Sequence, residues 1–553
     1  MATNIKPIKI AVADFETCFS NVEDKYRVWS WGFSYIKSNK VTMDTDIESF
    51  IELITSLKDT TILYFHNLKF DFSYIIDYLL RNGWEQILKG TRKKKQFTCF
   101  SSQGNIYFVK IGKVTILDSF KMLLGSLDSL GKGYGCKEVK QVGKIDYDKV
   151  REKGHIMTDE EVIYLRADIL LLAELIEKNI EIDRKFTSSK TIASHCYKEW
   201  LETTKLTKKQ LSISYEIDTA LRPAYRGGFV YVNPLHKNKI IDNVNTIDVN
   251  SLYPYVMLND MLPYGQPIIY NHMVKFRPFK RYVLDVTFTA KLKPNHVPTF
   301  QESKGFRGNS EYCIETGTDF NTVFCDYDYA LLLTNYDIKS LKVNKVYEFN
   351  AKRGLFNVFL NKYVEQKIEA TKTGNKPLRM QAKLKMNSLS GKFAQRPDST
   401  QDLYYIDELT DVIKAKKVET DVNMKYLPIS MFITAGGRRI LHDAIKKVGY
   451  KNFIYCDTDS IHHINNINSN YKSLGITVDS SVLGAWDLEK ENVQGKYLHA
   501  KCYFEDGKPT VAGLSKDTKI NINDFKHGME VSVLKSKRKK GGIALNRTTF
   551  EIK

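Results

Sequence analysis

The sequence lacks the cysteine spacing of a zinc-binding or disulfide-bonded protein. Its 553 residues include eight cysteines, and no two of them form a C-x-x-C pair. Neither a zinc site nor a disulfide framework is therefore indicated. We predict reduced thiols in a reducing compartment.

Long apolar runs are also missing. No run approaches the roughly 20 residues that a transmembrane helix needs. The opening residues, MATNIKPIKIAVADFET, do not have the layout of a secretory signal peptide. We therefore expect a cytoplasmic protein without a membrane partner.

Acidic residues are too few to balance the basic ones. The chain has 83 Lys and Arg against 64 Asp and Glu, a net charge of +19, together with 32 Tyr and 29 Phe. Positive charge suits a phosphate backbone, and aromatic rings can stack on bases. We expect a nucleic-acid partner and, from the length, about three to five folding units.

A first set of carboxylates lies in the N-terminal third. The strand pattern KIAVADFETC carries Asp14 and Glu16 two positions apart, so they share one face of an extended chain. After the strand TILYFHN, the segment NLKFDFSYIIDYLL has helical spacing with Asn67 and Asp71 one turn apart.

The third piece of this set is TDEEVIYLRADILLLAELI. It opens with the capping box Thr158-x-x-Glu161 and places Tyr164 and Asp168 on one helical face. Any one of these residues alone is more often a solvated charge or a packing group. Four acids together can hold two divalent ions about 3.5 to 4 Å apart, which is the arrangement for phosphodiester hydrolysis.

A second set of motifs follows downstream. Its pieces, in chain order, are AYRGGF with Tyr225, Gly227 and Gly228; VNTIDVNSLYP with Asp248 and Tyr253; RMQAKLKMNSLSGKF with Arg379, Lys383, Asn387 and Gly391; FITAGGRR with Thr434 and Arg438; IYCDTDS with Asp457 and Asp459; and KYLHAKCYF with Lys501 and Tyr503. Asp-Thr-Asp alone is ordinary turn chemistry. Two like charges only two positions apart also indicate a nearby cation.

The first set resembles the three motifs of the DnaQ-like, RNase H-related 3′→5′ proofreading exonucleases. The second resembles the motifs of family B DNA polymerases, in the protein-primed branch found in phages with linear genomes, the phi-twenty-nine type. The resemblance covers nearly the whole chain. It implies an α/β multidomain fold, with an RNase H-like exonuclease domain and a right-hand polymerase domain of palm, fingers and thumb that carries two insertions.

The resemblance also implies domain boundaries. These are exonuclease 1–187, first part of the palm 188–259, first insertion 260–352 in the terminal-protein region, fingers 353–395, second insertion 396–426 for strand displacement and processivity, second part of the palm 427–505, and thumb 506–553.

The implied activity is DNA-directed DNA synthesis with proofreading, by protein priming on a linear phage-type genome, processive and strand-displacing. The implied cofactor is Mg²⁺ or Mn²⁺, two ions per active site. The implied partners are primer-template and single-stranded DNA, dNTPs and a terminal (priming) protein. A monomer in the cytoplasm of an infected bacterial cell is expected.

The roles carried over from the family are as follows. Polymerase catalysis falls to Asp248, Asp457 and Asp459, and the metal ligands at that site are Asp248, Val249 and Asp457. Exonuclease catalysis falls to Asp14, Glu16, Asp71, Asp168 and Tyr164, of which Asp14, Glu16 and Asp168 bind metal. Nucleotide binding falls to Tyr253, Lys367, Lys383 and Asn387. DNA binding falls to Tyr225, Gly227, Gly228, Thr434, Arg438, Lys501, Tyr503, Thr17, His66, Asn67, Phe70, Ser119, Phe120 and Tyr147. Tyr253 would reject a 2′-hydroxyl by steric clash.

Two departures from the family pattern stand out. Ser390 replaces a tyrosine that would stack on the new base pair, so nucleotide affinity or selectivity is expected to differ. The exonuclease lysine of the family corresponds to either Lys140 or Lys144. Two other functions are also considered, a nuclease with a noncatalytic DNA-binding platform and a noncatalytic DNA-binding replication protein.

Overall fold

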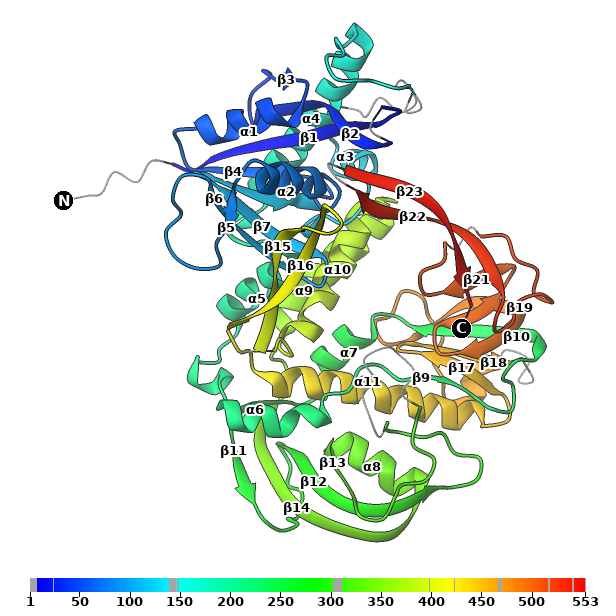
Figure 1. Cartoon of the computed structure of the whole chain (residues 1–553). Helices are drawn as coiled ribbons and strands as arrows, with labels where there is room; N and C mark the ends of the chain where they lie inside the picture. Colours follow the sequence, from blue (N-terminus) through cyan, green and yellow to red (C-terminus); the bar gives the residue numbers. More distant parts are fainter. Residues whose placement is uncertain are drawn as a thin grey trace.

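The computed structural model describes residues 7–22, 24–138, 146, 149–301, 311–396, 398–421, 423–465, 470–515, 518–539 and 542–552. Tyr147, Lys140 and Lys144 lie outside the described residues. The chain forms mixed sheets and helices arranged around a central region (Figure 1). No helix among the described residues is long and apolar enough to span a bilayer.

The N-terminal sheet contains the first carboxylate set. Its strands are β1 (Lys9–Ser20), β2 (Lys25–Tyr35), β3 (Thr42–Asp44), β4 (Thr61–Phe65), β5 (Glu85–Gln86), β6 (Gln96–Ser102), β7 (Asn105–Ile111) and β8 (Val114–Asp118). β1, β4 and β8 run parallel, and β2 is antiparallel to β1. The helices of this region are α1 (Ile47–Ser56), α2 (Asp71–Arg81), α3 (Leu127–Gly133) and α4 (Asp159–Ile182), with the 3₁₀ turn η1 (Ser119–Lys121).

Local sequence signals explain where α4 begins. The side chain of Thr158 accepts a hydrogen bond from the Glu161 backbone, and the Glu161 side chain accepts one from the Thr158 backbone. This is the capping box predicted from the sequence. The first turn of α4 carries acidic side chains, which interact favourably with the positive end of the helix dipole.

A central sheet carries the second carboxylate set. Its strand order is β21–β20–β19–β10–β18–β17–β9. The bounds are β9 (Val230–Val232), β10 (Ile240–Val249), β17 (Phe453–Asp457), β18 (Ser460–Ile464), β19 (Trp486–His499), β20 (Cys502–Glu505) and β21 (Lys508–Val511). The long helix α11 (Leu427–Val448) packs on α7 (Leu252–Asn259), and both contribute apolar side chains to the core beside this sheet.

Helices connect the two sheets. They are α5 (Ile192–Thr203), α6 (Tyr215–Leu221), α9 (Asn357–Lys372) and α10 (Lys376–Lys392), with the short turns η2 (Phe186–Ser188), η3 (Lys209–Leu211) and η4 (Arg222–Ala224). A further turn, η5 (Tyr471–Leu474), lies between β18 and β19 of the central sheet. The pair α9 and α10 packs side by side and lies between the N-terminal and central sheets (Figure 1). Asn375 caps α10 by accepting a hydrogen bond from the Leu378 backbone at 3.2 Å.

Two further units lie within residues 260–352 and 396–426, the ranges predicted to be insertions. The insertion sheet, in the order β11–β14–β12–β13, comprises β11 (Leu262–Tyr270), β12 (Lys280–Leu292), β13 (Phe320–Cys325) and β14 (Tyr336–Lys352), with α8 (Asp326–Asn335) packed against it. The second unit, termed the bridging hairpin, is β15 (Asp398–Asp407) paired with β16 (Val412–Asp421).

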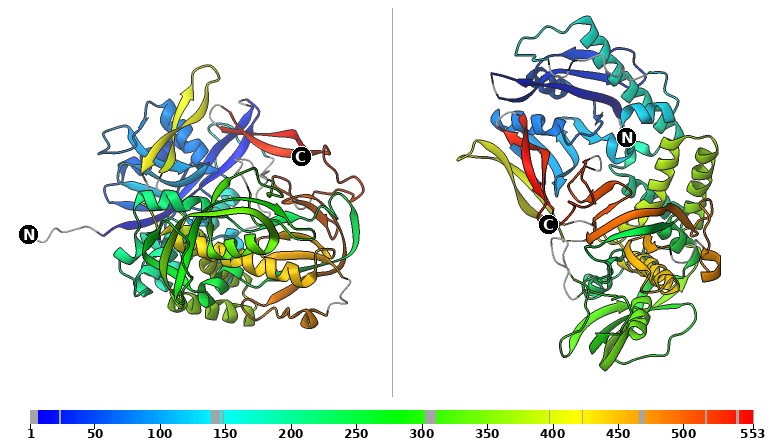
Figure 2. Two further views of the ribbon diagram at one scale, coloured as in Figure 1. Left: turned by 90° about the horizontal axis from the view of Figure 1, so that it is seen from below. Right: turned by 90° about the vertical axis from the view of Figure 1, so that its right-hand side faces the viewer.

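The C-terminal hairpin, β22 (Glu530–Lys539) and β23 (Gly542–Glu551), joins a sheet that is distant in sequence. Tyr26 of β2 pairs with Ile543, so the hairpin extends the edge of the N-terminal sheet. It also contacts the bridging hairpin through β22 and β16. The right-hand view of Figure 2 shows the two hairpins on the same side of the molecule. The domain boundaries themselves stay predictions.

Candidate functional site

β1 and α4 bring three of the predicted acids together. Asp14 and Glu16 share one face of β1, and α4 packs against that strand. One ligand oxygen from each of Asp14, Glu16 and Asp168 lies within 4.8 Å of the other two. Oxygen ligands of this kind suit Mg²⁺ and Mn²⁺, so the cluster has the donor set of a divalent-metal site.

Asp71 lies close to the same cluster. It is the first residue of α2, and burial raises the pKa of its carboxyl well above the usual range, with the charges of Asp14, Asp118 and Glu16 adding to the rise. Several carboxylates therefore lie close together here, and a bound cation would reduce the repulsion between them. Tyr164, one turn before Asp168 on α4, is buried beside Trp29 and Cys18.

Sequence reasoning missed Asp118. This residue ends β8, parallel to β4, and its side chain accepts hydrogen bonds from the Asn67 and Phe120 backbones at 2.9 and 3.0 Å. The available signal was an acid at the carboxyl end of the strand VTILD, because the ends of parallel strands meet at one edge of a sheet.

The helical placement of Asn67 was wrong. α2 begins at Asp71, and Asn67 lies before it in a left-handed backbone conformation with φ 69°. Its backbone N–H is bound to Asp118 instead of entering a helix. Asn tolerates this conformation better than most residues, so the segment turns before the helix starts.

The side chains expected to bind a single strand lie around this turn. His66 contacts the Ser119 hydroxyl and the Gly125 carbonyl, each at 2.9 Å, and its ring lies edge-on to Phe120 at 5.5 Å. Phe70 is 39% exposed. Thr17 follows an irregularity in the pairing of β1 with β2. Their binding of DNA stays a prediction, as does that of Asn67 and Tyr147.

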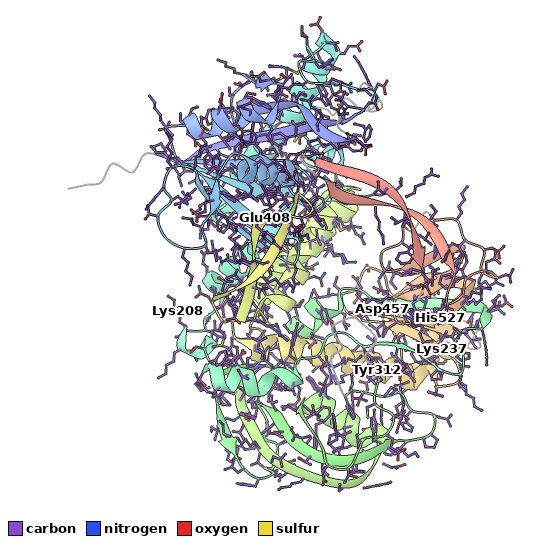
Figure 3. The ribbon with its side chains drawn as sticks, in the orientation of Figure 1. Lys208, Lys237, Tyr312, Glu408, Asp457 and His527 are labelled. Carbon is purple, nitrogen blue, oxygen red and sulfur yellow. The ribbon has the colours of Figure 1, made fainter. Side chains whose placement is uncertain are left out.

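The second set of acids meets at one end of the central sheet. Asp457 ends β17, Ser460 begins β18, and the turn between them places Thr458 at φ 64°. Ser460 pairs in register with both Asp248 and Asp457. The Val249 N–H donates to the Asp459 carbonyl at 2.8 Å. The predicted hairpin turn is confirmed, and Asp457 is labelled on these strands in Figure 3.

The carboxylates at this end of the central sheet repel each other. Burial raises the pKa of Asp248 to about 8, and the charges of Asp459, Glu489 and Asp487 add to the rise while Lys383 opposes it. Burial likewise raises the pKa of Asp459. Sequence reasoning missed Asp487 and Glu489, although their D-x-E spacing on a strand was a usable signal.

A protein cation lies beside Asp457, and the predicted metal at this end stays a prediction. The Lys501 ammonium lies 2.9 and 3.0 Å from the two Asp457 oxygens. The carboxylate oxygens of Asp248, Asp457 and Asp459 do not all lie within 4.8 Å of one another, whereas those of Asp14, Glu16 and Asp168 do. A metal at this end would take the place that Lys501 now occupies beside Asp457.

Two glycines allow close packing around these acids. A Cβ on Gly228 would lie 2.6 Å from the Thr458 hydroxyl, and one on Gly437 would lie 3.1 Å from the Tyr253 ring. The first glycine therefore holds the Y-x-G-G segment against the Asp-Thr-Asp turn. The second lets Tyr253, on α7, pack tightly on α11.

Arg438 and Thr434 are directed into the protein. The Arg438 guanidinium donates to both Asp328 oxygens, at 2.9 and 2.6 Å, and to the Arg226 and Gly227 carbonyls at 2.6 and 2.7 Å. The Thr434 hydroxyl donates to backbone carbonyls of its own helix. Arg438 thus positions the Y-x-G-G segment, while direct contact of either side chain with DNA stays a prediction. Asp328 had no motif that would have revealed it.

Basic and amide side chains of α9 and α10 lie beside the acids. Lys367 donates to the Asn250 side chain at 2.8 Å, and burial lowers the pKa of its ammonium to about 8, with Arg379 and Lys383 adding to the shift. Lys383 is exposed, and the Asn387 amide donates to its backbone carbonyl at 2.9 Å. The predicted helix over this motif is confirmed.

Three further residues singled out from the sequence have side-chain contacts within the protein. Tyr503 stacks on Tyr497, with ring centroids 5.6 Å apart. Burial raises the pKa of Tyr225, which packs against the largely apolar core. The Ser390 hydroxyl donates to the Asn387 carbonyl at 2.8 Å, so this short side chain is bound to its own helix.

The comparisons with known proteins agree with this arrangement. The family model "DNA polymerase type B, organellar and viral" matches residues 55–156 and 137–474. The DNA polymerase of Bacillus phage phi29 is 32% identical, covering 97% of this chain and 93% of the relative, and that of Bacillus phage PZA is 32% identical, covering 99% and 100%.

The solved structures point to the same group. Phi29 DNA polymerase complexed with primer-template DNA and incoming nucleotide substrates matches with a TM-score of 0.88 at 29% identity, covering 99% of this chain and 100% of that one. Phi29 DNA polymerase complexed with single-stranded DNA matches with a TM-score of 0.83. The likeness confirms the fold class expected from the sequence, and the chain belongs to the phi29-type branch of the type B DNA polymerases of organelles and viruses.

Proposed function

We propose that this chain is a DNA-directed DNA polymerase with a 3′→5′ proofreading exonuclease. The observation that carries the proposal is the presence of two separate carboxylate centres on two sheets of one chain. Support also comes from the relatives, which are bacteriophage DNA polymerases, and from a similar structure that holds primer-template DNA and nucleotides. A noncatalytic DNA-binding protein would need neither centre.

The central-sheet acids would carry nucleotidyl transfer. Asp248, Asp457 and the Val249 carbonyl would hold two divalent ions, with Asp459 beside them. When bound, such ions supply charge stabilisation to the triphosphate and to the attacking primer hydroxyl. Lys383 and Lys367 would bind the triphosphate as point charges, and Asn387 would lie beside it on the same face of α10.

The N-terminal acids would carry phosphodiester hydrolysis. Asp14, Glu16 and Asp168 would hold the metal ions, and Asp71 would lie beside them. Tyr164 lies one turn before Asp168 on α4, and its hydroxyl is the group assigned to this site. The rings of His66 and Phe120 contact each other, and the Phe70 ring contacts Tyr74. His66, Phe120 and Phe70 are all at least partly exposed, so a frayed strand could stack on them.

A single paired assay tests this function. The chain is given a primed DNA template with Mg²⁺, once with dNTPs and once without. We expect primer extension in the first tube and primer shortening in the second. Shortening without extension would favour the nuclease with a noncatalytic platform, and neither activity would favour the DNA-binding replication protein.

Tyr253 is proposed to exclude ribonucleotides. Its ring is held against Gly437 of α11 and cannot retreat from an additional hydroxyl without disturbing that contact. We expect Tyr253→Val to raise the efficiency of ribonucleotide incorporation by at least about 100-fold, because the clash disappears. Steady-state kcat/KM for dNTP and rNTP measures this, with Tyr255→Phe, on the same helix, as control. Unchanged discrimination would place the gate elsewhere.

The bridging hairpin is proposed to hold the polymerase on DNA and to force the complementary strand aside. Tyr404 contacts the Ser101 hydroxyl at 3.0 Å, and its backbone N–H donates to Gln86 at 3.0 Å. At the tip, Arg81 pairs with Asp411 at 2.6 Å. Figure 3 labels Glu408 at this tip, beside the N-terminal sheet. The hairpin therefore connects the region of α11 to the N-terminal sheet.

Replacing residues 396–426 by a short Gly/Ser linker should spare short primer fill-in. We expect product length in single-binding conditions, and synthesis through a downstream duplex, to fall by at least about tenfold, because a closed passage retains DNA through topology instead of affinity. Primer extension with a heparin trap measures both. Asp411→Ala, which removes the ion pair with Arg81 but keeps the Arg81 hydrogen bond to the Asp411 carbonyl, should show a smaller loss, and Glu408→Ala should show none. Long products from the linker variant with the trap present would refute the clamp role.

The insertion sheet is proposed to contact the terminal protein that primes replication. Apolar side chains on β11 and the following loop are exposed, with Phe279 at 74% and Ile268 at 52%. Exposed apolar groups gathered on one unit are typical of a protein-binding surface. The relatives are bacteriophage DNA polymerases. We propose that this chain acts in the cytoplasm of an infected bacterium, as a monomeric polymerase that replicates a linear genome.

A further inference from the structure

A pocket of about 360 Å³, termed the basic pocket, lies at the edge of the N-terminal sheet, where the loop 87–95 leads from β5 to β6. Its lining includes four consecutive cations: Arg92, Lys93, Lys94 and Lys95. No carboxylate is present among the described residues that line it. The positive charge of the pocket therefore favours an anionic ligand.

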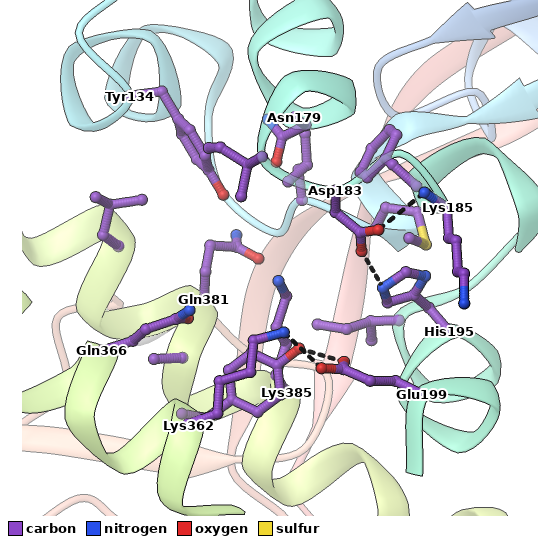
Figure 4. A pocket seen from close by; sticks show the side chains of 18 of the residues that line it. Tyr134, Asn179, Asp183, Lys185, His195, Glu199, Lys362, Gln366, Gln381 and Lys385 are labelled. Atoms are coloured by element: carbon purple, nitrogen blue, oxygen red, sulfur yellow. Dashed lines mark hydrogen bonds and ion pairs between the residues drawn. The ribbon is translucent and has the colours of Figure 1, made fainter. Parts of the chain in front are cut away.

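A larger cavity elsewhere in the molecule has a balanced charge. It has a volume of about 980 Å³ and lies between the carboxyl end of α4, α5 and the α9–α10 pair (Figure 4). Five Lys and Arg and four Asp and Glu line it, and His195 contacts Asp183 at 2.7 Å while Lys362 contacts Glu199 at 2.5 Å. The charges of this cavity largely neutralise one another, unlike those of the basic pocket.

The cations of the basic pocket have no acidic partners. In the part of the chain that the structure describes, no salt bridge involves any of the four, and Lys93, Lys94 and Lys95 are exposed. The neighbouring acid Glu85 accepts a hydrogen bond from the Gln96 amide at 2.8 Å instead. A phosphate group could therefore bind here without displacing a carboxylate.

Hydrogen bonds hold the loop of the basic pocket in place. The Arg92 guanidinium donates to the Gly112 carbonyl at 3.0 Å, and the Lys93 N–H donates to the Gln96 side chain at 2.9 Å. The loop therefore presents its cations from an ordered backbone. Such an arrangement reduces the conformational entropy that is lost when a ligand binds.

An aromatic side chain also lines the basic pocket. Trp84 is partly buried and packs against the core of the N-terminal sheet. The Lys95 ammonium donates to the carbonyl of Asn82, two residues before Trp84, at 3.1 Å. Cations beside an aromatic ring are typical of sites for single-stranded nucleic acid, because the ring stacks on a base while the cations contact phosphates.

The basic pocket lies far from the N-terminal acids. Gly112, in its lining, comes just before β8, and Asp118 ends that strand beside the acids. The five residues of β8 span about 17 Å. The pocket therefore lies at the opposite edge of the sheet from the N-terminal carboxylate centre and is not part of it.

The bridging hairpin lies between the basic pocket and the C-terminal hairpin. β16 contacts β22 of the C-terminal hairpin, whereas β15 contacts β6. Gln86, the last residue of β5, donates to the Asp402 carbonyl of β15 at 3.0 Å, and the loop begins at the next residue. Figure 1 shows β5 and β6 on one side of the bridging hairpin and β22 and β23 on the other. The pocket is thus on the outer side of the bridging hairpin.

We propose that the basic pocket binds the DNA strand displaced ahead of the polymerase. One base would stack on Trp84, and the phosphates beside it would pair with Lys93 and Lys94. The inference rests on the proposed strand displacement, because a strand forced aside by the bridging hairpin on its outer side would pass the pocket. Binding of that strand would hinder its return to the template.

Fluorescence anisotropy of the full chain with DNA in excess EDTA tests the proposal without catalysis. The substrates share one primer-template, which has no downstream strand, a fully paired downstream strand, or a downstream strand with an unpaired 5′ oligo(dT) flap. We expect the flap to lower the Kd about tenfold relative to the fully paired substrate. Because no synthesis is needed, a chain without polymerase activity could still show this effect, so the two proposals fail separately.

The double variant Lys93→Ala with Lys94→Ala should abolish the effect of the flap. Its Kd for the primer-template alone should stay within about twofold of the parent. The slope of log Kd against log salt for the flap substrate should fall by about 1.4, because each phosphate contact with a single strand contributes about 0.7. The matched control is Lys237→Ala with Lys239→Ala, two exposed lysines beside the central sheet, where Figure 3 labels Lys237.

Trp84→Leu tests the stacking separately. It should weaken binding of the oligo(dT) flap about tenfold and leave an abasic sugar-phosphate flap unchanged, since that flap has no base to stack. Equal losses with both flaps would overturn the stacking contact. The whole proposal is overturned if the flap does not improve binding to the folded parent, if the fully paired substrate binds as tightly, or if the control pair loses the flap effect as the Lys93 and Lys94 variant does.

Discussion

Asp457→Ala should abolish primer extension while primer shortening continues at the parent rate. The substitution removes a carboxylate from the end of β17 and leaves the N-terminal cluster untouched. Loss of one group that stabilises transition-state charge costs about 10²- to 10³-fold, and loss of a metal ligand should cost more. We expect extension to fall at least about 10³-fold in single-turnover assays on a primed template.

Two controls accompany this variant. Asp457→Asn keeps the shape of the side chain, and it should lose extension as well because the amide carries no charge. Asp443→Ala removes an exposed acid from α11 and should extend primers normally. Extension by Asp457→Ala within about tenfold of the parent would exclude a catalytic role for this end of the central sheet.

The double variant Asp14→Ala with Asp168→Ala should abolish shortening and spare extension. It removes two of the three clustered ligands. Sites far apart in different domains rarely couple strongly. We expect shortening of a single-stranded primer to fall at least about 10³-fold, measured without dNTPs, while the extension rate stays within about twofold.

This double variant should also fold well. The charge of Asp14 contributes to the raised pKa of Asp71, after burial itself, so removing Asp14 relieves repulsion in the cluster. The melting temperature should therefore not fall in metal-free buffer. Glu160→Ala, at an exposed position of α4, is the matched control and should keep both activities. Loss of extension in a folded double variant would contradict two separable centres.

The sequence predicted those parts of the site that depend on local patterns. The D-x-E spacing on β1, the capping box of α4 and the turn after Asp457 are each set by residues a few positions apart. The periodicity of the Lys383 motif likewise predicted α10. Residues at such spacings share a strand face or a helix face whatever the rest of the chain does.

Features that depend on distant contacts could not be predicted in this way. Asp328 is buried against Arg438, 110 positions away in sequence. The C-terminal hairpin pairs with β2 at Tyr26, and the bridging hairpin contacts Arg81 and Gln86. Asn67 lies outside the helix predicted for it, because its backbone N–H is bound by the side chain of Asp118, which is 51 positions away in sequence.

Anomalous diffraction from crystals grown with Mn²⁺, primer-template DNA and a non-hydrolysable nucleotide would test the central claim most directly. The claim is that two separate carboxylate centres each bind divalent metal. We expect anomalous peaks beside Asp14, Glu16 and Asp168, and a second group between Asp248 and Asp457, with Lys501 displaced from Asp457. Absence of a peak from either centre at saturating Mn²⁺ would contradict the claim.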